Sequence, residues 1–167
     1  MKNLEDWIGN QTSQSETIYQ HALNGFAAIM DEDGPTSDLV PPGGHWMYFL
    51  PTDRQSRIGP DGHAFKGEFL PPVELPRRMW AGGRIDFHAP LRAGDTAEKI
   101  STIKSVTQKQ GRTGALVFVT VEHQIRNGAG LCLREEHDIV YREAAGKASG
   151  EMKVKQAAPS DGIWEKT

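Results

Sequence analysis

The sequence predicts a single α+β domain, in which one amphipathic helix is followed by a strongly curved antiparallel β-sheet. Apolar residues recur at helical spacing between residues 10 and 33, and the pattern changes to strict alternation after residue 80. Asn127 and Gly128, a pair that favours a tight hairpin turn, separate two apolar alternating segments. With 167 residues, of which 37% are hydrophobic, the chain is long enough to bury one core.

Residues 10–33 are expected to hold the helix and its flanks. Its core-facing residues recur at spacings of four, four and three: Ile18, Ala22, Phe26 and Ile29. The side chains that can cap its start are Thr12, Ser13 and Ser15. Residues 33–35, Asp-Gly-Pro, should end the helix, because proline cannot continue the hydrogen-bond ladder.

Residues 35–76 contain eight of the ten prolines and enclose one apolar segment, residues 45–50. The flanking glycines and Pro51 favour a short buried helix there, and periodicity alone leaves a strand of the same length open. The aromatic residues of this segment are expected mainly in the core: Trp46, Tyr48 and Phe49. Residues 52–72 are rich in Gly, Asp, Arg and Pro, which predicts a long surface loop that is a functional cover or disordered.

The second half of the chain predicts the sheet. Residues 80–88 and 96–107 alternate as strands, the second with a bulge where the apolar alternation is displaced, and residues 90–95 form a turn. The clearest strand follows, with one face made of Ala115, Val117, Val119, Val121, His123 and Ile125. A returning strand after the hairpin turn contains Leu131, Leu133, Ile139, Val140 and Tyr141.

The composition sets the expected domain boundary and surroundings. Residues 1–145 are expected to form the domain, and residues 146–167 a flexible tail or a truncated linker. The formal net charge of −3 gives no basic field for nucleic acid. The N-terminus lacks the pattern of a signal peptide, and no window approaches the roughly 20 apolar residues that span a bilayer. Cys132, the single cysteine, cannot form an internal disulfide. Together these features predict a cytoplasmic protein that binds no membrane.

Common catalytic motifs are absent from the sequence. The six histidines match no His-x-x-x-His or Glu-x-x-His spacing, so no metal is expected. There is no Gly-x-Ser-x-Gly nucleophile motif. The Gly43-Gly44 and Gly82-Gly83 pairs lack the further residues of a phosphate loop or a dinucleotide-binding fingerprint.

A family resemblance begins with residues 79–88, MWAGGRIDFH, followed by APLRAGD at residues 89–95. This run resembles the Gly-to-Phe, Pro and Gly-Asp pattern of MaoC-like hot-dog proteins. Four further segments are similar to the N-terminal half of the two-hot-dog type 2 3-hydroxyacyl-thioester dehydratases, including mesaconyl-CoA hydratase relatives: residues 4–9, 45–51, 67–83 and 135–142. The resemblance covers nearly the whole chain, and it is more specific for the family than for the activity, because one fold hosts many functions.

The resemblance implies a hot-dog fold, a curved antiparallel sheet wrapped around a central helix, with two such units side by side. An acyl-CoA or acyl-carrier thioester would lie in the tunnel between them as substrate, and no other cofactor is implied. The reaction is the reversible addition of water to an enoyl thioester. A carboxylate or amide orients water, a neutral histidine moves its proton, and backbone N–H groups stabilise the enolate oxygen.

The catalytic half of the family carries Asp-x-Asn-Pro-x-His, or a related Asn and His pattern, just after the first helix. Here residues 31–37 read DEDGPTS, with neither the asparagine nor the histidine. The resemblance therefore implies a first half that works with a catalytic MaoC-like partner, or a degenerate homodimer. The remaining candidates for an acid–base pair are His45 and Asp33. If such polar side chains met inside a closed cavity, a self-sufficient lyase would be the better description.

Six residues are candidates for substrate contact: Trp46, Arg78, Trp80, Gly82, Gly83 and Arg84. The arginines, with Arg77, suit the phosphates of coenzyme A, yet most arginines are solvated or in exposed ion pairs. The glycines let backbone approach the pantetheine arm, or they mark a bulge at a bend of the sheet.

Other polar residues have simpler expected roles. His45 either faces the thioester or is a packed histidine bonded to a loop carbonyl. His88 and His123 are expected to pack within strands. The acidic residues near the C-terminal strand are expected on a solvated face: Glu135, Glu136 and Asp138.

Two classes of function therefore stay open. The first is a component of an acyl-CoA hydratase or dehydratase that needs a catalytic partner. The second is a non-catalytic acyl-thioester binding or regulatory module. A hot-dog thioesterase usually relies on an acid in its central helix, and residues 44–50 contain none.

Overall fold

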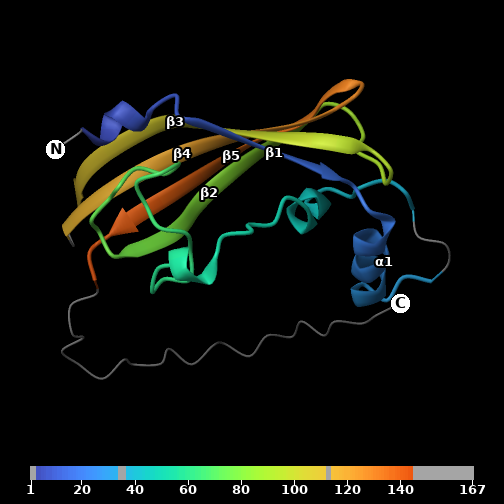
Figure 1. The fold of residues 1–167 in the computed structure, drawn as a ribbon, viewed down its shortest axis with the longest axis horizontal. Coiled ribbons are helices and arrows are strands. Elements are labelled where there is room, and N and C mark those ends of the chain that lie inside the picture. The colour runs from blue at the N-terminus through green and yellow to red at the C-terminus, as the bar shows by residue number, and fades with distance from the viewer. Residues whose placement is uncertain (1–2, 34–36, 112–113, 145–167) are drawn as a thin grey trace, which may run out of the picture.

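One five-stranded antiparallel sheet dominates the computed structural model, which describes residues 3–33, 37–111 and 114–144 (Figure 1). The strand order is β1-β3-β4-β5-β2. The strands are β1 (Gln11–Thr17), β2 (Arg77–Phe87), β3 (Thr96–Gly111), β4 (Gly114–Asn127) and β5 (Gly130–Arg142). The helical elements are α1 (Gln20–Ile29) and the 3-10 turns η1 (Leu4–Trp7), η2 (Gly44–Met47) and η3 (Gln55–Arg57). The predicted α+β class is confirmed.

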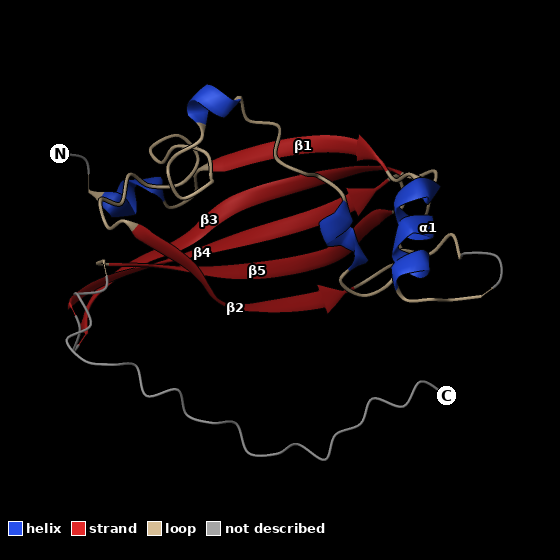
Figure 2. Cartoon of the chain, turned by 90° about the horizontal axis from the view of Figure 1, so that it is seen from below, coloured by secondary structure: helices blue, strands red, loops and turns tan. Residues whose placement is uncertain are grey.

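The segments between α1 and β2 lie on the concave side of the sheet and cover part of it (Figures 1 and 2). In the view onto this face, η2 lies in front of the middle strands and α1 lies at one end of the sheet (Figure 2). Within the described residues, no helix is long and apolar enough to cross a membrane.

The region expected as one long helix divides into a strand and a shorter helix. Residues 11–17 form β1, which pairs with β3 along its whole length, so the predicted caps Thr12, Ser13 and Ser15 lie in a strand. The prediction failed because pairing with β3 outweighs the weak local preferences of this polar segment. α1 instead starts after Tyr19, which makes no side-chain capping bond.

The buried face of α1 also differs from the predicted stripe. Leu23 and Ala27 are buried, whereas Ile29 is 82% exposed. Of the predicted stripe, Ile18 is completely buried just before α1, and Ala22 and Phe26 are partly buried. The prediction was wrong for Ile29 and missed Leu23 and Ala27. α1 ends at Ile29, before the predicted stop, and Asp31 adopts a positive φ of 57°. Gly34 and Pro35 lie outside the described residues.

The apolar segment after Gly43-Gly44 is only partly the predicted buried helix. η2 ends at Met47, and the chain then runs on in a non-helical conformation. Tyr48 and Phe49 are buried, as expected for core residues, while Trp46 is 62% exposed. The helical turn and the extended part together let this short segment place two aromatic rings against the sheet.

The predicted strands in the second half are confirmed, including the hairpin after Asn127. The buried face of β4 contains Val117, Val119, Val121 and Ile125, as the alternation predicted. β3 does contain a bulge, but it lies between Ile103 and Ser105, and beyond it Val106 takes the buried position. The predicted displacement between Ile100 and Ile103 was wrong, because the register is regular there and Ile100 lies on the face opposite Ile103. A second bulge lies between Trp80 and Gly82 in β2, directly before the glycine pair, whose two residues themselves stay paired with β5.

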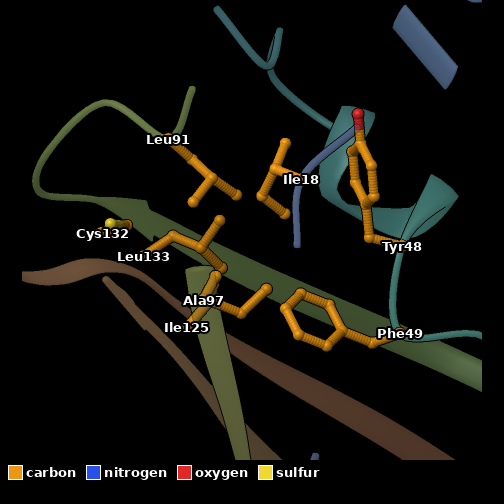
Figure 3. Packing of buried hydrophobic residues seen from close by; sticks show 8 residues of the cluster. All are labelled: Ile18, Tyr48, Phe49, Leu91, Ala97, Ile125, Cys132 and Leu133. Atoms are coloured by element: carbon orange, nitrogen blue, oxygen red, sulfur yellow. The ribbon is translucent and has the colours of Figure 1, made fainter. Parts of the chain in front are cut away.

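Two apolar clusters fill the concave side. The first joins the end of β1, the segment after η2 and the strands (Figure 3): Ile18, Tyr48, Phe49, Leu91, Ala97, Ile125, Cys132 and Leu133. The second lies toward the other end of the same strands: Val73, Ile103, Val106, Val117, Val119, Val121, Ile139 and Tyr141. The predicted tail, residues 146–167, lies outside the described residues, and the predicted boundary stays a prediction.

Two isoleucines of the predicted helical stripe make a matched test of this packing. Ile18 is completely buried, so Ile18→Ala should lower the free energy of unfolding by about 3 kcal/mol through lost contacts and a cavity. Ile29→Ala on the exposed face of α1 should change it by less than about 0.5 kcal/mol. Urea denaturation measures both. Similar losses for the two variants would contradict the observed helix boundary and phase.

Candidate functional site

A row of polar residues crosses the concave face between the two apolar clusters. Ser101 of β3 pairs with His123 of β4, which pairs with Glu135 of β5. Lys99 lies two residues before Ser101 in β3, and His137 lies two residues after Glu135 in β5. Both face the same side as this row, because side chains of a strand alternate between its two sides. We call these five residues the polar belt.

Glu135 holds η2 against the sheet. Its Oε2 lies 3.1 Å from Nε2 of His45, and Trp46 Nε1 donates to both carboxylate oxygens at 3.1 and 3.2 Å. His45 is only 3% exposed. Burial acts to raise the pKa of Glu135, but the hydrogen bonds from His45 and Trp46 outweigh it and lower the pKa. The carboxylate is therefore ionised, with donors on both of its oxygens.

The imidazoles of the polar belt are neutral near pH 7. Burial lowers the pKa of His123 to about 4, and it also lowers the pKa of His137. The Nδ1 of His123 lies 2.8 Å from Ser101 Oγ. Each neutral ring offers one donor and one acceptor nitrogen, so these two histidines can hydrogen-bond a polar ligand without carrying a charge.

Lys99 supplies the cation of the belt. Its ammonium donates to the Phe49 carbonyl at 3.2 Å. Burial lowers the pKa of Lys99, against the opposite influence of Glu135 and Glu16. The carboxylates therefore help to keep this half-buried amine charged.

Two adjoining cavities open over the belt. One, of about 340 Å³, lies among His45, Trp46, Trp80, Glu135 and His137. The other, of about 570 Å³, lies beneath the loop from Pro51 to Leu70 and reaches Arg78 and Ser101. Lys99 and His123 line both cavities, so the two cavities are neighbours on the concave face.

The predicted pair of His45 and Asp33 is not formed. Asp33 is exposed in the loop after α1, whereas His45 is buried against Glu135. The expected loop carbonyl for a packed His45 is thus replaced by a carboxylate. The interpretation of Glu135 as a solvated residue was wrong. Glu135 is an even number of residues from Leu133 and Ile139, and this spacing could have placed it on the same inner face.

The candidates for substrate contact divide between the two faces of the sheet. Trp46 and Trp80 line the smaller cavity, and the buried Arg78 lines the larger one. Arg84 lies on the opposite, convex face, where it pairs with Glu136 at 2.7 Å and Asp138 at 2.8 Å, as predicted for an exposed ion-pair arginine. Gly83 lies after the β2 bulge, where an added Cβ would come within 3.2 Å of the Glu136 carbonyl.

The structure also shows the surroundings of the remaining histidines and the cysteine discussed from the sequence. His123 packs in its strand as expected, but His88 follows the end of β2 and is exposed, which corrects its predicted packing. Cys132 is buried, and burial raises the pKa of its thiol, which makes it a poor nucleophile. In the part of the chain that the structure describes, no three His, Cys, Asp or Glu side chains converge as a metal site.

The depressed pKa of His123 predicts a loss of stability in mild acid. The unfolded chain takes up a proton on this histidine below about pH 6.5, whereas the folded protein does so only near pH 4. Stability should therefore fall between pH 7.5 and 5, by on the order of 2 kcal/mol. His123→Asn should flatten this dependence in urea titrations, leaving the smaller contribution of His137. An unchanged slope in the variant would contradict the buried neutral imidazole.

Adjacent glutamates on opposite faces test the anchor of η2. Glu135→Gln removes the charge that accepts from His45 and Trp46, and should cost about 2 kcal/mol of unfolding free energy at pH 7. Glu136→Gln removes exposed ion pairs and should cost under about 1 kcal/mol. Thermal and urea unfolding compare the two, and equal losses would argue against the anchor.

Comparison with known proteins places this architecture in a family. Residues 43–166 match the family of hydroxyacyl-thioester dehydratases of type 2. Over 140 residues the chain is 47% identical to mesaconyl-C(4)-CoA hydratase of Chloroflexus aurantiacus, which covers 82% of this chain and 50% of that protein. The chain thus spans about half the length of this relative.

Two solved structures from Mycobacterium tuberculosis share the fold. A chain of the ChsH1-ChsH2 complex superposes with a TM-score of 0.60 at 13% identity, covering 82% of this chain and 86% of that one. A chain of the HadBC 3R-hydroxyacyl-ACP dehydratase complex gives 0.51 at 15% identity, covering 83% and 99%. The predicted hot-dog fold is confirmed, and the chain belongs to the hydroxyacyl-thioester dehydratase type 2 family.

Proposed function

We propose that the chain is the substrate-binding half of an enoyl-thioester hydratase or 3-hydroxyacyl-thioester dehydratase. A second MaoC-like hot-dog unit supplies the catalytic acid and histidine. In this division of labour, the concave face of the present chain receives the acyl part of a coenzyme A or carrier-protein thioester. The reaction adds water to the enoyl double bond, or removes it in the reverse direction.

The observation that carries this proposal is the composition of the loop after α1. Residues 31–44 contain no histidine and no asparagine, and Asp33 is exposed there. Hydration of an enoyl thioester needs a group that moves a proton next to the reacting carbon. The proton-transfer pair of the family pattern is thus missing at this position.

The His45–Glu135 pair is better explained as an anchor than as a replacement for that pair. His45 is almost completely buried, and both oxygens of Glu135 accept hydrogen bonds from η2. A general base has to reach a substrate water with a free acceptor atom. Within the described residues, Nδ1 of His45 has no hydrogen-bond partner, but it is shielded from solvent. The bonds of Glu135 instead fix the segment that closes the concave face.

The edge of the sheet supports a paired assembly. β2 is an edge strand, and Trp80 and Phe87 on it are exposed together with Trp46 of η2. Edge strands and exposed aromatic groups are favourable sites for association. The complexes that contain the two superposed chains are named for two components each, which favours a heterodimer over a homodimer.

Hydration of crotonyl-CoA tests the proposal. The purified chain alone should show no turnover above the uncatalysed rate. Co-purification with a MaoC-like chain that retains Asp-x-Asn-Pro-x-His should raise the rate at least about a hundredfold, the usual contribution of acid–base catalysis. The assay follows loss of the enoyl-thioester absorbance, with the partner chain alone as control.

Two other outcomes have definite meanings. Turnover by the isolated chain that His45→Gln abolishes would replace the proposal by a self-sufficient lyase, the reading favoured by the 3.1 Å contact between His45 and Glu135. Thioester binding without turnover in any assembly would favour the binding or regulatory module.

A further inference from the structure

Residues 51–65, which we call the cover segment, are folded on themselves over the larger cavity. Ile58 and Ala64 form an isolated antiparallel bridge, and the Gly59 N–H donates to the His63 carbonyl at 2.7 Å. In the part of the chain that the structure describes, the backbone hydrogen bonds of this segment all lie within it. No residue of the cover segment is buried. The segment therefore keeps its shape with few contacts to the sheet.

The chain is fixed on both sides of the cover segment. Before it, the side chain of Gln14 donates to the Leu50 carbonyl at 3.3 Å. After it, the side chain of Asn10 donates to the carbonyls of Glu68 and Phe69 at 3.0 and 2.9 Å. Phe69 also packs against the second apolar cluster. Movement in this region is therefore confined to the residues between these two fixed points.

Two ion pairs join the cover segment to its surroundings within the described residues. Arg57 pairs with Glu68, but both side chains are at least half exposed, so the pair stabilises little. Asp61 Oδ2 lies 3.2 Å from Nη2 of Arg78, whose side chain is only 10% exposed. Breaking this second pair leaves a buried arginine without its compensating charge, which is costly. The Asp61–Arg78 pair is thus the main polar contact that holds the segment on the sheet.

The cover segment forms the outer wall of the larger cavity. Residues 51–53 and 64–65 line this cavity of about 570 Å³ from outside, and Lys99, Ser101 and His123 line it from the sheet. Ser101 is only 4% exposed. Displacement of the cover segment would open this part of the polar belt to solvent and to ligands.

We propose that the cover segment is a lid, which opens and closes as one body over the larger cavity and is held closed by the Asp61–Arg78 ion pair. Opening breaks this pair and the exposed Arg57–Glu68 pair, but none of the segment's own backbone hydrogen bonds. A segment without buried side chains opens at a lower free-energy cost than the core. The inference goes beyond the proposed function, since it concerns how the cavity is reached.

Thiol labelling of the full chain measures lid opening. Ser101→Cys places a reporter thiol in the cavity under the lid, and the natural Cys132, which is completely buried in the first apolar cluster, reports global unfolding. Dithiobis-nitrobenzoate gives a coloured product as each thiol reacts. The introduced thiol should react at least about tenfold faster than Cys132, because local opening costs less free energy than global unfolding.

Variants in the Ser101→Cys background test the ion pair. Asp61→Asn should accelerate labelling of the introduced thiol at least about fivefold, because the lid loses the charge that faces Arg78. The rate at Cys132 should stay the same. The matched control is Asp53→Asn, which removes the same charge from the cover segment where no ion pair is formed within the described residues, and should change the rate less than about twofold. Arg78→Gln should reproduce the effect of Asp61→Asn from the sheet side.

Three outcomes would overturn the lid. Equal labelling rates at the two thiols would mean that the cavity is reached only by global unfolding. Equal rates with and without Asp61→Asn, or equal acceleration by Asp61→Asn and Asp53→Asn, would exclude a specific role of the ion pair. If thermal unfolding shows that Ser101→Cys is not folded, Gln14→Cys provides a reporter in the same cavity from β1. No thioester takes part in this assay, so its failure leaves the proposed function intact.

Discussion

The registry of β3, β4 and β5 is the constraint on which the rest of the structure depends. A tight turn after Asn127 fixes the pairing of β4 with β5, and the bulge after Ile103 fixes which residues of β3 face inward. A shift by one residue would exchange the inner and outer faces. The observed registry sets Ser101, His123 and Glu135 in one row and keeps the valines of β4 in the core.

Burying this polar row costs desolvation free energy, which hydrogen bonds from the surrounding segments offset. Polar groups taken from water must find partners, or each costs about 1–3 kcal/mol. Glu135 finds donors in η2, His123 finds Ser101, and Lys99 finds the Phe49 carbonyl. The covering segment is therefore held by polar bonds as well as by the packing of Tyr48 and Phe49. Among the described residues, atoms of His45, Arg78 and Tyr141 lack a hydrogen-bond partner, although Asp61 forms an ion pair with Arg78 at 3.2 Å.

The charged side chains on the two faces of the sheet differ in their exposure to solvent. On the convex face, Arg84, Lys104, Glu122 and Glu136 form exposed ion pairs, each of small energetic value. On the concave face, fewer charges are present and each is partly or fully desolvated. Interactions there are stronger, because water screens them less. Ligand recognition in the proposed assembly thus depends on a few inner side chains.

The sequence by itself determined the elements whose local pattern is strong. Alternation in residues 115–125 and the Asn127-Gly128 turn predicted the central hairpin, and quoted segments such as residues 79–95 identified the family. Tertiary structure decided where the local pattern was weak or misleading. Residues 11–17 form an edge strand because they pair with β3. Glu135 anchors η2 because the alternation of β5 places its side chain on the inner face, opposite η2. The placement of Arg78 and Lys99 around one cavity follows from strand pairing between distant segments, which local spacing cannot reveal.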